Sequence, residues 1–210
     1  TAFADSWARI CDEFDLIFDT VENITAFRQA ILQLAVQGKL VPQNPEDEPA
    51  HVLLERIKAE KARLVKEGKI KKSKALPPVA EDEVPFEVPK GWMWVKLDSI
   101  CTFITDGTHY TPTYTSSGVP FLSVKDVSSG IINFTNTKYI SKSEHIGFKN
   151  RCNPEFEDIL LTKVGTTGIA KVIDVSFEFS IFVSLALLKV PKKMVYPYYL
   201  ELALNSPLGK

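Results

Sequence analysis

The residues best suited to chemistry lie between Thr105 and Tyr114, where hydroxyl, imidazole and phenol groups alternate with glycine and proline. Such side chains offer hydrogen-bond donors and acceptors without a large charge, which suits contact with base edges and phosphates. In the alternative reading, the segment is a self-contained turn in which Asp106 and Thr108 bond their own backbone. Composition leaves both readings open. The candidate contacts in this segment are Thr108, His109, Tyr110, Thr111 and Tyr114.

Motifs for catalysis are missing from the sequence. It contains no GxxxxGK(S/T) phosphate loop, no GxGxxG and no HExxH, so nucleotide hydrolysis, dinucleotide binding and zinc proteolysis have no support. The two Asn-Pro pairs stand in the wrong context for an adenine methyltransferase loop. A nuclease would gather carboxylates and a lysine around a metal, but no acidic residue lies two positions before Lys163. We therefore expect no catalytic residue and no bound metal in this chain.

The composition is typical of a folded soluble protein, since 45% of the 210 residues are hydrophobic and 24% are charged. No apolar run approaches the roughly 20 residues of a membrane span, and no signal peptide is visible, so we expect a cytoplasmic location without membrane contact. The three cysteines lack CxxC spacing and are expected to be reduced. His51 and His145 stand in polar surroundings and are expected to face solvent.

The net charge of −1 argues against a simple electrostatic DNA binder, because such proteins usually carry a large basic excess. The charge is nevertheless unevenly distributed along the chain. Lys and Arg residues are concentrated between Glu55 and Lys74, and acidic residues follow from Glu81 to Glu87. A basic run of this kind is typical of a solvated helix face.

Apolar residues near the N-terminus recur at alternating steps of three and four, which is the pattern of a heptad seam. Gly38 and Pro42 supply a helix stop. The pattern predicts one helix from about Asp5 to about Gln37, a rod of about 45 to 50 Å at about 1.5 Å per residue. Such a seam needs a partner helix in this chain or another. The partner-facing residues, with one polar interruption, are Trp7, Ile10, Phe14, Ile17, Val21, Ile24, Arg28 and Ile31.

A second, more basic helix is predicted from about Ala50 to about Lys66, and it could fold back on the first. Prolines between Lys74 and Gly91 predict a linker. We expect a helical region over residues 1–75, a proline-rich linker over 76–91 and a globular domain over 92–210. The fold class is thus α+β, with a long antiparallel helical, coiled-coil-like arm and a mixed α/β, strand-rich domain.

Short runs rich in Val, Ile, Leu and Phe follow Gly91 and are typical of strands. The glycines of the segment 165–168 predict a hairpin between two of these runs. A helix is predicted from Tyr198 to Asn205. The predicted strands cover residues 119–124, 159–164, 169–175 and 181–190.

Taken together, several segments resemble type I restriction-modification specificity subunits. The stretches 30–43 and 53–57 resemble the conserved helical region of that family, and the sequence Pro-Lys-Gly-Trp of residues 89–92 resembles the opening of a target-recognition domain. The similarity covers nearly the whole chain in the family's order. The remaining matching segments are 106–109 (DGTH), 111–112, 119–126, 158–168, 198–200 and 204–207.

The resemblance implies a non-catalytic subunit that reads one half of a split double-stranded DNA target. It implies methyltransferase (M) and restriction (R) subunits as partners, which would hold the cofactors S-adenosylmethionine, ATP and Mg, while this chain holds none. Family members usually carry two recognition domains, whereas this chain has one and ends early. We expect either a fragment or a half-subunit that forms a homodimer through its helical arm. Further expected DNA contacts are Lys125, Lys138, Lys163, Thr166 and Thr167.

Two other functions remain open on the sequence. A coiled-coil scaffold whose globular end binds protein would fit the heptad seam and the near-zero charge equally well. An enzyme, such as the recognition end of a fused methyltransferase-nuclease, would require catalytic sequence that these residues lack.

Overall fold

The computed structural model describes residues 2–72 and 76–209, apart from the side chains of residues 2–4, 6 and 17. Contacts between residues divide the chain into two units, Thr1–Gln43 and Asn44–Lys210. The division follows Gln43, so the second predicted helix and the proline-rich segment 76–91 belong to the same unit as the strands. Each unit is described by itself.

The first unit contains three helices in place of the single helix predicted from Asp5 to Gln37. They are α1 (Ala2–Asp12), α2 (Phe14–Ile17) and α3 (Val21–Val36). The helix stop predicted at Gly38 is confirmed, because Gly38 has a φ of 68° and the following N–H of Lys39 donates to the carbonyl of Leu34 at 2.9 Å. The prediction of one continuous rod was wrong, and a long coiled-coil arm is not shown in the described residues.

The break before α3 has a local cause. Thr20 has extended backbone angles, and its hydroxyl accepts a hydrogen bond from the N–H of Asn23 at 3.1 Å, which is an N-cap. The carboxylate of Asp19 accepts a second hydrogen bond, from the amide nitrogen of Asn23 at 2.6 Å. Thr20 thus satisfies one free N–H group of a new helix start, and Asp19 holds the side chain of Asn23, so the apolar periodicity continues while the helix does not.

In the second unit, α4 (Ala50–Lys66) has the predicted bounds. Ile57 is buried on its apolar side, which packs against the short helix α5 (Leu97–Ile100). Lys61 fixes this contact by donating a hydrogen bond to the carbonyl of Asp98 at 2.6 Å. The intervening segment contains a 3-10 turn, η1 (Glu81–Glu83), and the basic run before it ends at Lys74, which lies outside the described residues.

Four strands form an antiparallel sheet in the order β1-β8-β5-β6. The hairpin predicted around residues 165–168 is confirmed, since β5 and β6 pair antiparallel on either side of it. Gly165 and Gly168 adopt the positive φ angles of 75° and 80° that this turn requires. The bounds are β1 (Phe103–Asp106), β5 (Ile159–Thr162), β6 (Ala170–Val172) and β8 (Leu185–Lys189).

The antiparallel sheet is buried on both faces, because alternate residues of a strand point to opposite sides. Leu160 and Leu187 belong to one buried cluster, together with Phe179 and Ile181. The neighbouring residues along these strands, such as Leu188, belong to a second cluster under α7 (Pro197–Asn205), the helix predicted near the C-terminus. The core of the second unit therefore lies on either side of β5 and β8.

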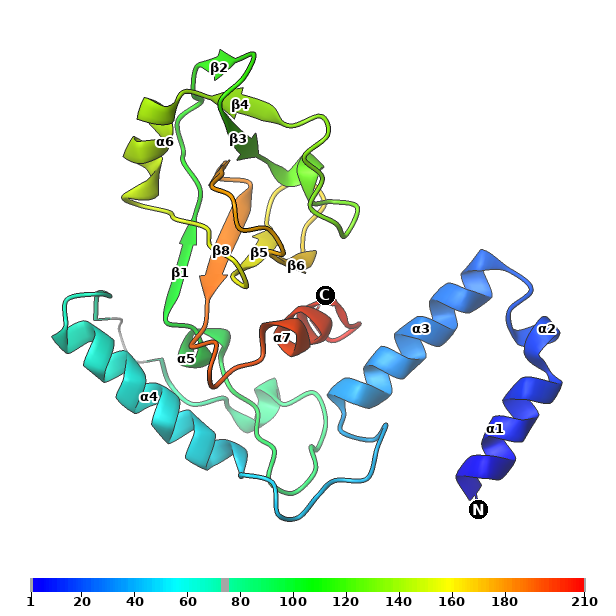
Figure 1. Cartoon of the computed structure of the whole chain (residues 1–210). Helices are drawn as coiled ribbons and strands as arrows, with labels where there is room; N and C mark the ends of the chain where they lie inside the picture. Colours follow the sequence, from blue (N-terminus) through cyan, green and yellow to red (C-terminus); the bar gives the residue numbers. More distant parts are fainter. Residues whose placement is uncertain (1, 73–75, 210) are drawn as a thin grey trace. The chain divides into compact units, whose positions relative to one another are not determined.

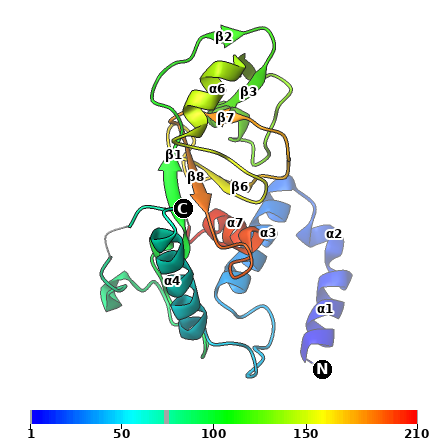
Figure 2. The ribbon, with the colours of Figure 1, turned by 60° about the vertical axis from the view of Figure 1, so that its left-hand side comes forward.

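A second, mixed sheet has the order β2-β4-β3-β7, with a parallel pairing between β3 and β7. Figures 1 and 2 show this sheet above the antiparallel one, with α6 beside it and α7 below the antiparallel sheet. A 3-10 turn, η2 (Val124–Asp126), follows β3 directly. The bounds are β2 (Tyr114–Thr115), β3 (Val119–Leu122), β4 (Lys138–Ile140), β7 (Ser180–Ile181) and α6 (Lys142–Lys149).

His145, which was expected to face solvent, is buried on α6. Its Nδ1 lies 2.9 Å from the hydroxyl of Ser180 on β7, and its Nε2 lies 3.5 Å from the carboxylate of Glu178. The surrounding polar residues of α6 obscured the fact that this position faces the sheet. His51, at the start of α4, is exposed as expected.

Candidate nucleic-acid interface

Asp106, the last residue of β1, is the centre of a charged cluster. Its carboxylate lies 2.7 Å from the ammonium of Lys163 and 2.5 Å from the guanidinium of Arg151. It also lies 2.9 Å from Nε2 of His109. The Asp106 side chain is 19% exposed, whereas those of Arg151 and His109 are 56% and 52% exposed. The acid is thus largely covered by basic groups that face solvent, and we call these four residues the Asp106 cluster.

The topology explains why Asp106 and Lys163 meet. β1 and β5 both pair antiparallel with β8, so they run in the same direction and end at the same edge. Asp106 pairs with Ala186 of β8, and Thr162, which precedes Lys163, pairs with the adjacent Leu185.

The electrostatics of the Asp106 cluster favour anion binding. Hydrogen bonds from Lys163, and then from Arg151 and His109, hold the pKa of the Asp106 carboxyl well below its usual range. The carboxylate is therefore ionised, and it offsets one of the two positive charges of Lys163 and Arg151. The remaining positive charge is exposed on side chains that ion pairs hold to Asp106, and guanidinium and ammonium groups held in this way can contact phosphate oxygens.

The loop after Asp106 is held closely against the segment that follows β7. A Cβ atom at Gly107 would lie 2.1 Å from the carbonyl oxygen of Ile181, so only glycine fits there. Thr108 forms a bridge with Phe182, and its hydroxyl accepts a hydrogen bond from the N–H of Tyr110 at 3.1 Å. Thr108 is buried and bonds the local backbone, as the alternative reading of this segment has it. Asp106 departs from that reading, because its carboxylate contacts basic side chains. The adjacent His109 and Tyr110 point to solvent.

A second group of predicted contacts surrounds a hollow of about 340 Å³ in the mixed sheet. The ammonium of Lys138 on β4 lies 3.8 Å from the centre of the Tyr114 ring on β2. This is a cation–π contact, which orients both side chains. The hollow is lined by Tyr114, Phe121, Ser123, Lys125, Lys138 and Phe182.

The structure thus sorts the predicted contacts into groups. His109 and Lys163 meet at Asp106, and Tyr114, Lys125 and Lys138 meet at the hollow. Thr166 and Thr167 are exposed in the β5–β6 turn that begins after Lys163, and Thr111 is exposed beyond Tyr110. Thr108 is the one member of the set that is buried.

Sequence reasoning missed Arg151 and Phe182. Arg151 follows α6 and lies 45 residues from Asp106 in the chain. Its immediate neighbours in sequence carry no motif, so only the three-dimensional contact identifies it. Phe182 stands in a run predicted as strand, and its place at the hollow results from the pairing of β7 with β3.

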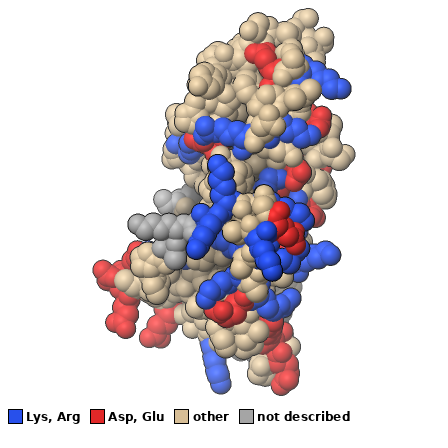
Figure 3. Space-filling view, turned by 90° about the vertical axis from the view of Figure 1, so that its left-hand side faces the viewer, with Lys and Arg blue, Asp and Glu red and all other residues tan. Residues whose placement is uncertain are grey.

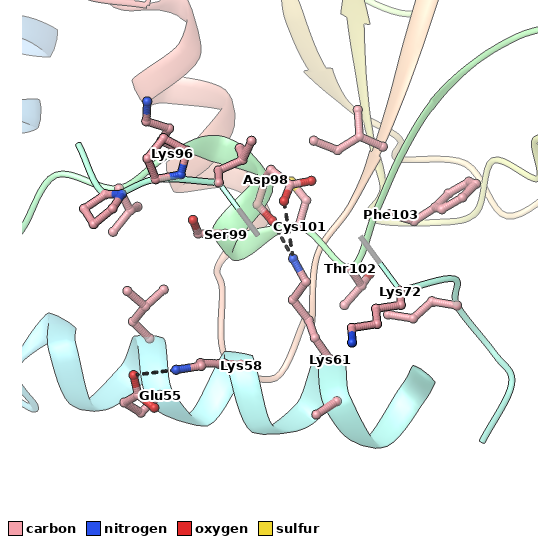
Figure 4. A pocket seen from close by; sticks show the side chains of 18 of the residues that line it. Glu55, Lys58, Lys61, Lys72, Lys96, Asp98, Ser99, Cys101, Thr102 and Phe103 are labelled. Carbon is pink, nitrogen blue, oxygen red and sulfur yellow. Dashed lines mark hydrogen bonds and ion pairs between the residues drawn. The ribbon is translucent and has the colours of Figure 1, made fainter. Parts of the chain in front are cut away.

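A larger cleft of about 940 Å³ lies between α4 and the segments before and after α5. Figure 4 shows Lys58, Lys61 and Lys96 around it. Each of these lysines has a partner, since Lys58 pairs with Glu55, Lys61 with Asp98 and Lys96 with Glu83. Lys71 and Lys72 also line the cleft and have no ion pair among the described residues, so part of the positive charge of the cleft stays unpaired.

Basic groups also gather on a wider scale. Figure 3 shows Lys and Arg side chains across the middle of one face, with smaller groups of Asp and Glu among and below them. The net charge of −1 is therefore the sum of unevenly placed charges. Among the described residues no three His, Cys, Asp or Glu side chains are grouped as metal ligands, and no helix is long and apolar enough to cross a membrane.

The helical first unit exposes most of its predicted seam. Trp7, Phe14 and Val21 are 57%, 55% and 74% exposed, and Ile24 and Ile31 are also exposed. Arg28 is exposed and Ile10 is half-buried, while the side chain of Ile17 lies outside the described residues. Exposed apolar side chains in such number are typical of a surface that another protein covers.

Comparisons with known proteins relate this chain to one kind of protein, although no protein-family model matches it. It is 47% identical over 147 residues to the type I restriction enzyme EcoAI specificity subunit of Escherichia coli, covering 70% of this chain and 25% of that protein. It is 59% identical over 97 residues to the EcoEI specificity subunit of the same species, covering 46% of this chain and 16% of that protein. The chain therefore spans a quarter or less of the curated relatives it matches.

Among solved structures, the HsdS subunit from Thermoanaerobacter tengcongensis is similar with a TM-score of 0.40 and 19% identity. The similarity covers 75% of this chain and 40% of that chain.

Proposed function

We propose that this chain, which is homologous to type I restriction enzyme specificity subunits, recognises a DNA sequence through the Asp106 cluster and the loops of its mixed sheet. The resemblance seen in the sequence motifs is confirmed by the two curated relatives. The observation that carries the proposal is the convergence of basic and aromatic side chains from distant segments onto exposed positions of the two sheets.

The two groups of side chains suit two different tasks. Contacts to phosphates fix a protein on the duplex, and contacts to base edges select the sequence. The Asp106 cluster presents Arg151 and Lys163 as cationic donors, which suits phosphate oxygens. The hollow combines apolar walls with ammonium groups, which suits base edges. A net charge near zero then requires that other polypeptides supply further phosphate contacts.

In the finer form of the proposal, the chain reads one half of a split target and docks methyltransferase and restriction subunits. The exposed seam on the first unit, with Trp7 and Val21 at its most exposed positions, supports a docking role. Catalysis, S-adenosylmethionine, ATP and Mg then belong to those partners. Because these enzymes act on intracellular DNA, the complex would be cytoplasmic. Pairing of two copies through the helical unit would supply the second half-site.

The scaffold function remains the competing proposal, since the same exposed seam would serve it. A selection from a random duplex pool distinguishes the two functions, performed with the chain alone and with its methyltransferase subunits. DNA recognition predicts an enriched sequence in the complex. A scaffold predicts no enrichment in either sample.

A salt series then tests the Asp106 cluster. Lys163→Ala should weaken binding to the selected duplex and reduce the slope of log affinity against log salt by about one. Lys193→Ala is the matched control, because Lys193 is an exposed lysine in the loop before α7, away from the cluster in sequence and without an ion pair among the described residues. Unchanged affinity in Lys163→Ala at every salt concentration would remove the cluster from the interface.

A further inference from the structure

The hollow in the mixed sheet has walls of a defined chemical kind. Phe121 on β3 is 2% exposed and forms part of its floor, with Tyr114 and Phe182 beside it. The N–H of Phe182 donates to the carbonyl of Leu122 at 2.8 Å, which fixes this wall to the parallel pair of strands β3 and β7. The apolar part of the hollow is therefore built on strands rather than on free loops.

The polar groups of the hollow are the ammonium groups of two lysines and the hydroxyl groups of Ser123 and Tyr114. Among the described residues, no carboxylate pairs with Lys138, whose ammonium instead rests over the Tyr114 ring. Lys125 is partly engaged, since its ammonium lies 3.4 Å from the carbonyl of Asn136 and 4.0 Å from the carboxylate of Asp126, so Lys138 is the freer donor. The hydroxyl of Ser123 donates to Asp126 at 3.0 Å and is not a free donor. None of the six described lining residues is an acid or an amide.

The four bases differ in what they show in the major groove. Thymine presents an acceptor, O4, beside an apolar C5 methyl group, whereas guanine presents two acceptors without a methyl group. Adenine and cytosine present N–H donors, which a carboxylate or an amide receives best. A site with apolar walls and ammonium donors, and without acid or amide, complements thymine better than the other three.

We propose that the hollow is a thymine-reading site, in which the C5 methyl group contacts the ring edges of Tyr114 and Phe182, and Lys138 donates to O4. This inference rests on the proposed function and adds the base that one part of the domain selects. Stacking of an unpaired base is less favoured, because Lys138 covers the face of Tyr114 and Phe121 is almost fully buried.

The test uses the complex with methyltransferase subunits and the duplex enriched from the random pool. Each thymine is replaced in turn by deoxyuridine, which removes the methyl group and keeps O4. We expect one position at which this replacement weakens binding about fourfold, the ratio that corresponds to burying one methyl group. Replacements elsewhere should leave the affinity unchanged.

Two variants assign the effect to the hollow. In Tyr114→Ala the difference between thymine and deoxyuridine should disappear at that position, and Tyr114→Phe should restore it. Lys138→Met should weaken binding to both duplexes equally, because both keep O4. Lys142→Met, an exposed lysine on α6 outside the hollow, is the matched control. Circular dichroism establishes that each variant is folded.

The outcomes separate the two proposals. If the pool yields no enriched sequence, the proposed function fails and this inference fails with it. If a sequence is enriched but deoxyuridine binds as well as thymine at every position, the function stands and the inference is overturned. The inference is also overturned if Tyr114→Ala is folded and retains the full difference in affinity between the thymine and deoxyuridine duplexes.

Discussion

The carboxylate of Asp106 lies 2.7 Å from the ammonium of Lys163, although 57 residues separate them in the chain. β1 and β5 are not neighbours in the sheet, since β8 lies between them. The ion pair therefore connects the ends of β1 and β5 across β8, which lies between them. The pair places a carboxylate within a surface that we propose binds DNA, whose phosphates are also negative. Substitution of this carboxylate tests how it affects binding.

Replacing Asp106 with Asn tests whether the acid repels DNA or positions the basic groups. Simple electrostatics predicts stronger DNA binding once a negative charge is removed. We expect weaker binding by roughly tenfold, about 1.4 kcal/mol, because Lys163 and Arg151 lose the group that orients them. Fluorescence anisotropy at several salt concentrations measures the change. Asp174→Asn, an exposed acid without an ion pair among the described residues, is the control. Tighter binding by Asp106→Asn would show that positioning is unimportant.

The same pairs make the stability of the second unit depend on pH. Asp106 has a folded pKa below its unfolded value of about 4, so its ion pairs stabilise the fold above that pH. This stabilisation is lost as pH falls through the folded pKa. Denaturant unfolding at about pH 7 and about pH 3 should show that the advantage of wild type over Asp106→Asn is smaller at the lower pH, which lies below the unfolded pKa but still above the folded one. An equal difference in the free energy of unfolding between wild type and Asp106→Asn at both pH values would contradict the ion pairing of Asp106.

Gly107→Ala tests the contact between the loop after β1 and the segment after β7. The added methyl group would lie 2.1 Å from the carbonyl oxygen of Ile181, so backbone must move. We expect a loss of about 1 to 3 kcal/mol in the free energy of unfolding. Gly147→Ala in α6 is the matched control, because nothing lies within 4 Å of its Cβ. Alanine favours a helix over glycine by about 1 kcal/mol, so this control should be neutral or stabilising.

His145 is expected to be a structural residue rather than a surface one. His145→Ala would leave the buried hydroxyl of Ser180 without its partner, which lies 2.9 Å away. The free energy of unfolding should fall by about 1 to 3 kcal/mol. In the double variant with Ser180→Ala, the loss should be smaller than the sum of the two single losses. His51→Ala, at an exposed position, should change stability by less than about 0.5 kcal/mol. Additive losses would show that the two side chains do not interact.

The cysteines should differ in reactivity. Burial raises the pKa of both Cys101 and Cys152 to about 12, so each is a neutral thiol at pH 8. Cys11 is exposed on α1. A thiol reagent at pH 8 should therefore modify one cysteine rapidly in the native protein and all three after denaturation. Rapid modification of Cys152 in the native protein would show that its surroundings open easily.

Local signals in the sequence predicted several elements well. The bounds of α4 were predicted from apolar spacing and Pro49, and the hairpin of β5 and β6 from glycines whose positive φ angles the turn requires. The helix break at Thr20 was missed because two local signals compete there. The N-cap at Thr20 starts a new helix although the apolar spacing continues through it, and the prediction rested on that spacing alone.

The amino-acid sequence by itself determined the elements whose cause lies within a few residues, and it supplied the motifs that pointed to the right family. Tertiary structure alone decided that Arg151 and Lys163 share Asp106, that Phe182 lines the hollow, and that His145 is buried. The physical reason is distance along the chain. A turn or a cap is stabilised by its immediate neighbours, whereas an ion pair between strand ends exists only after non-adjacent strands have paired around β8.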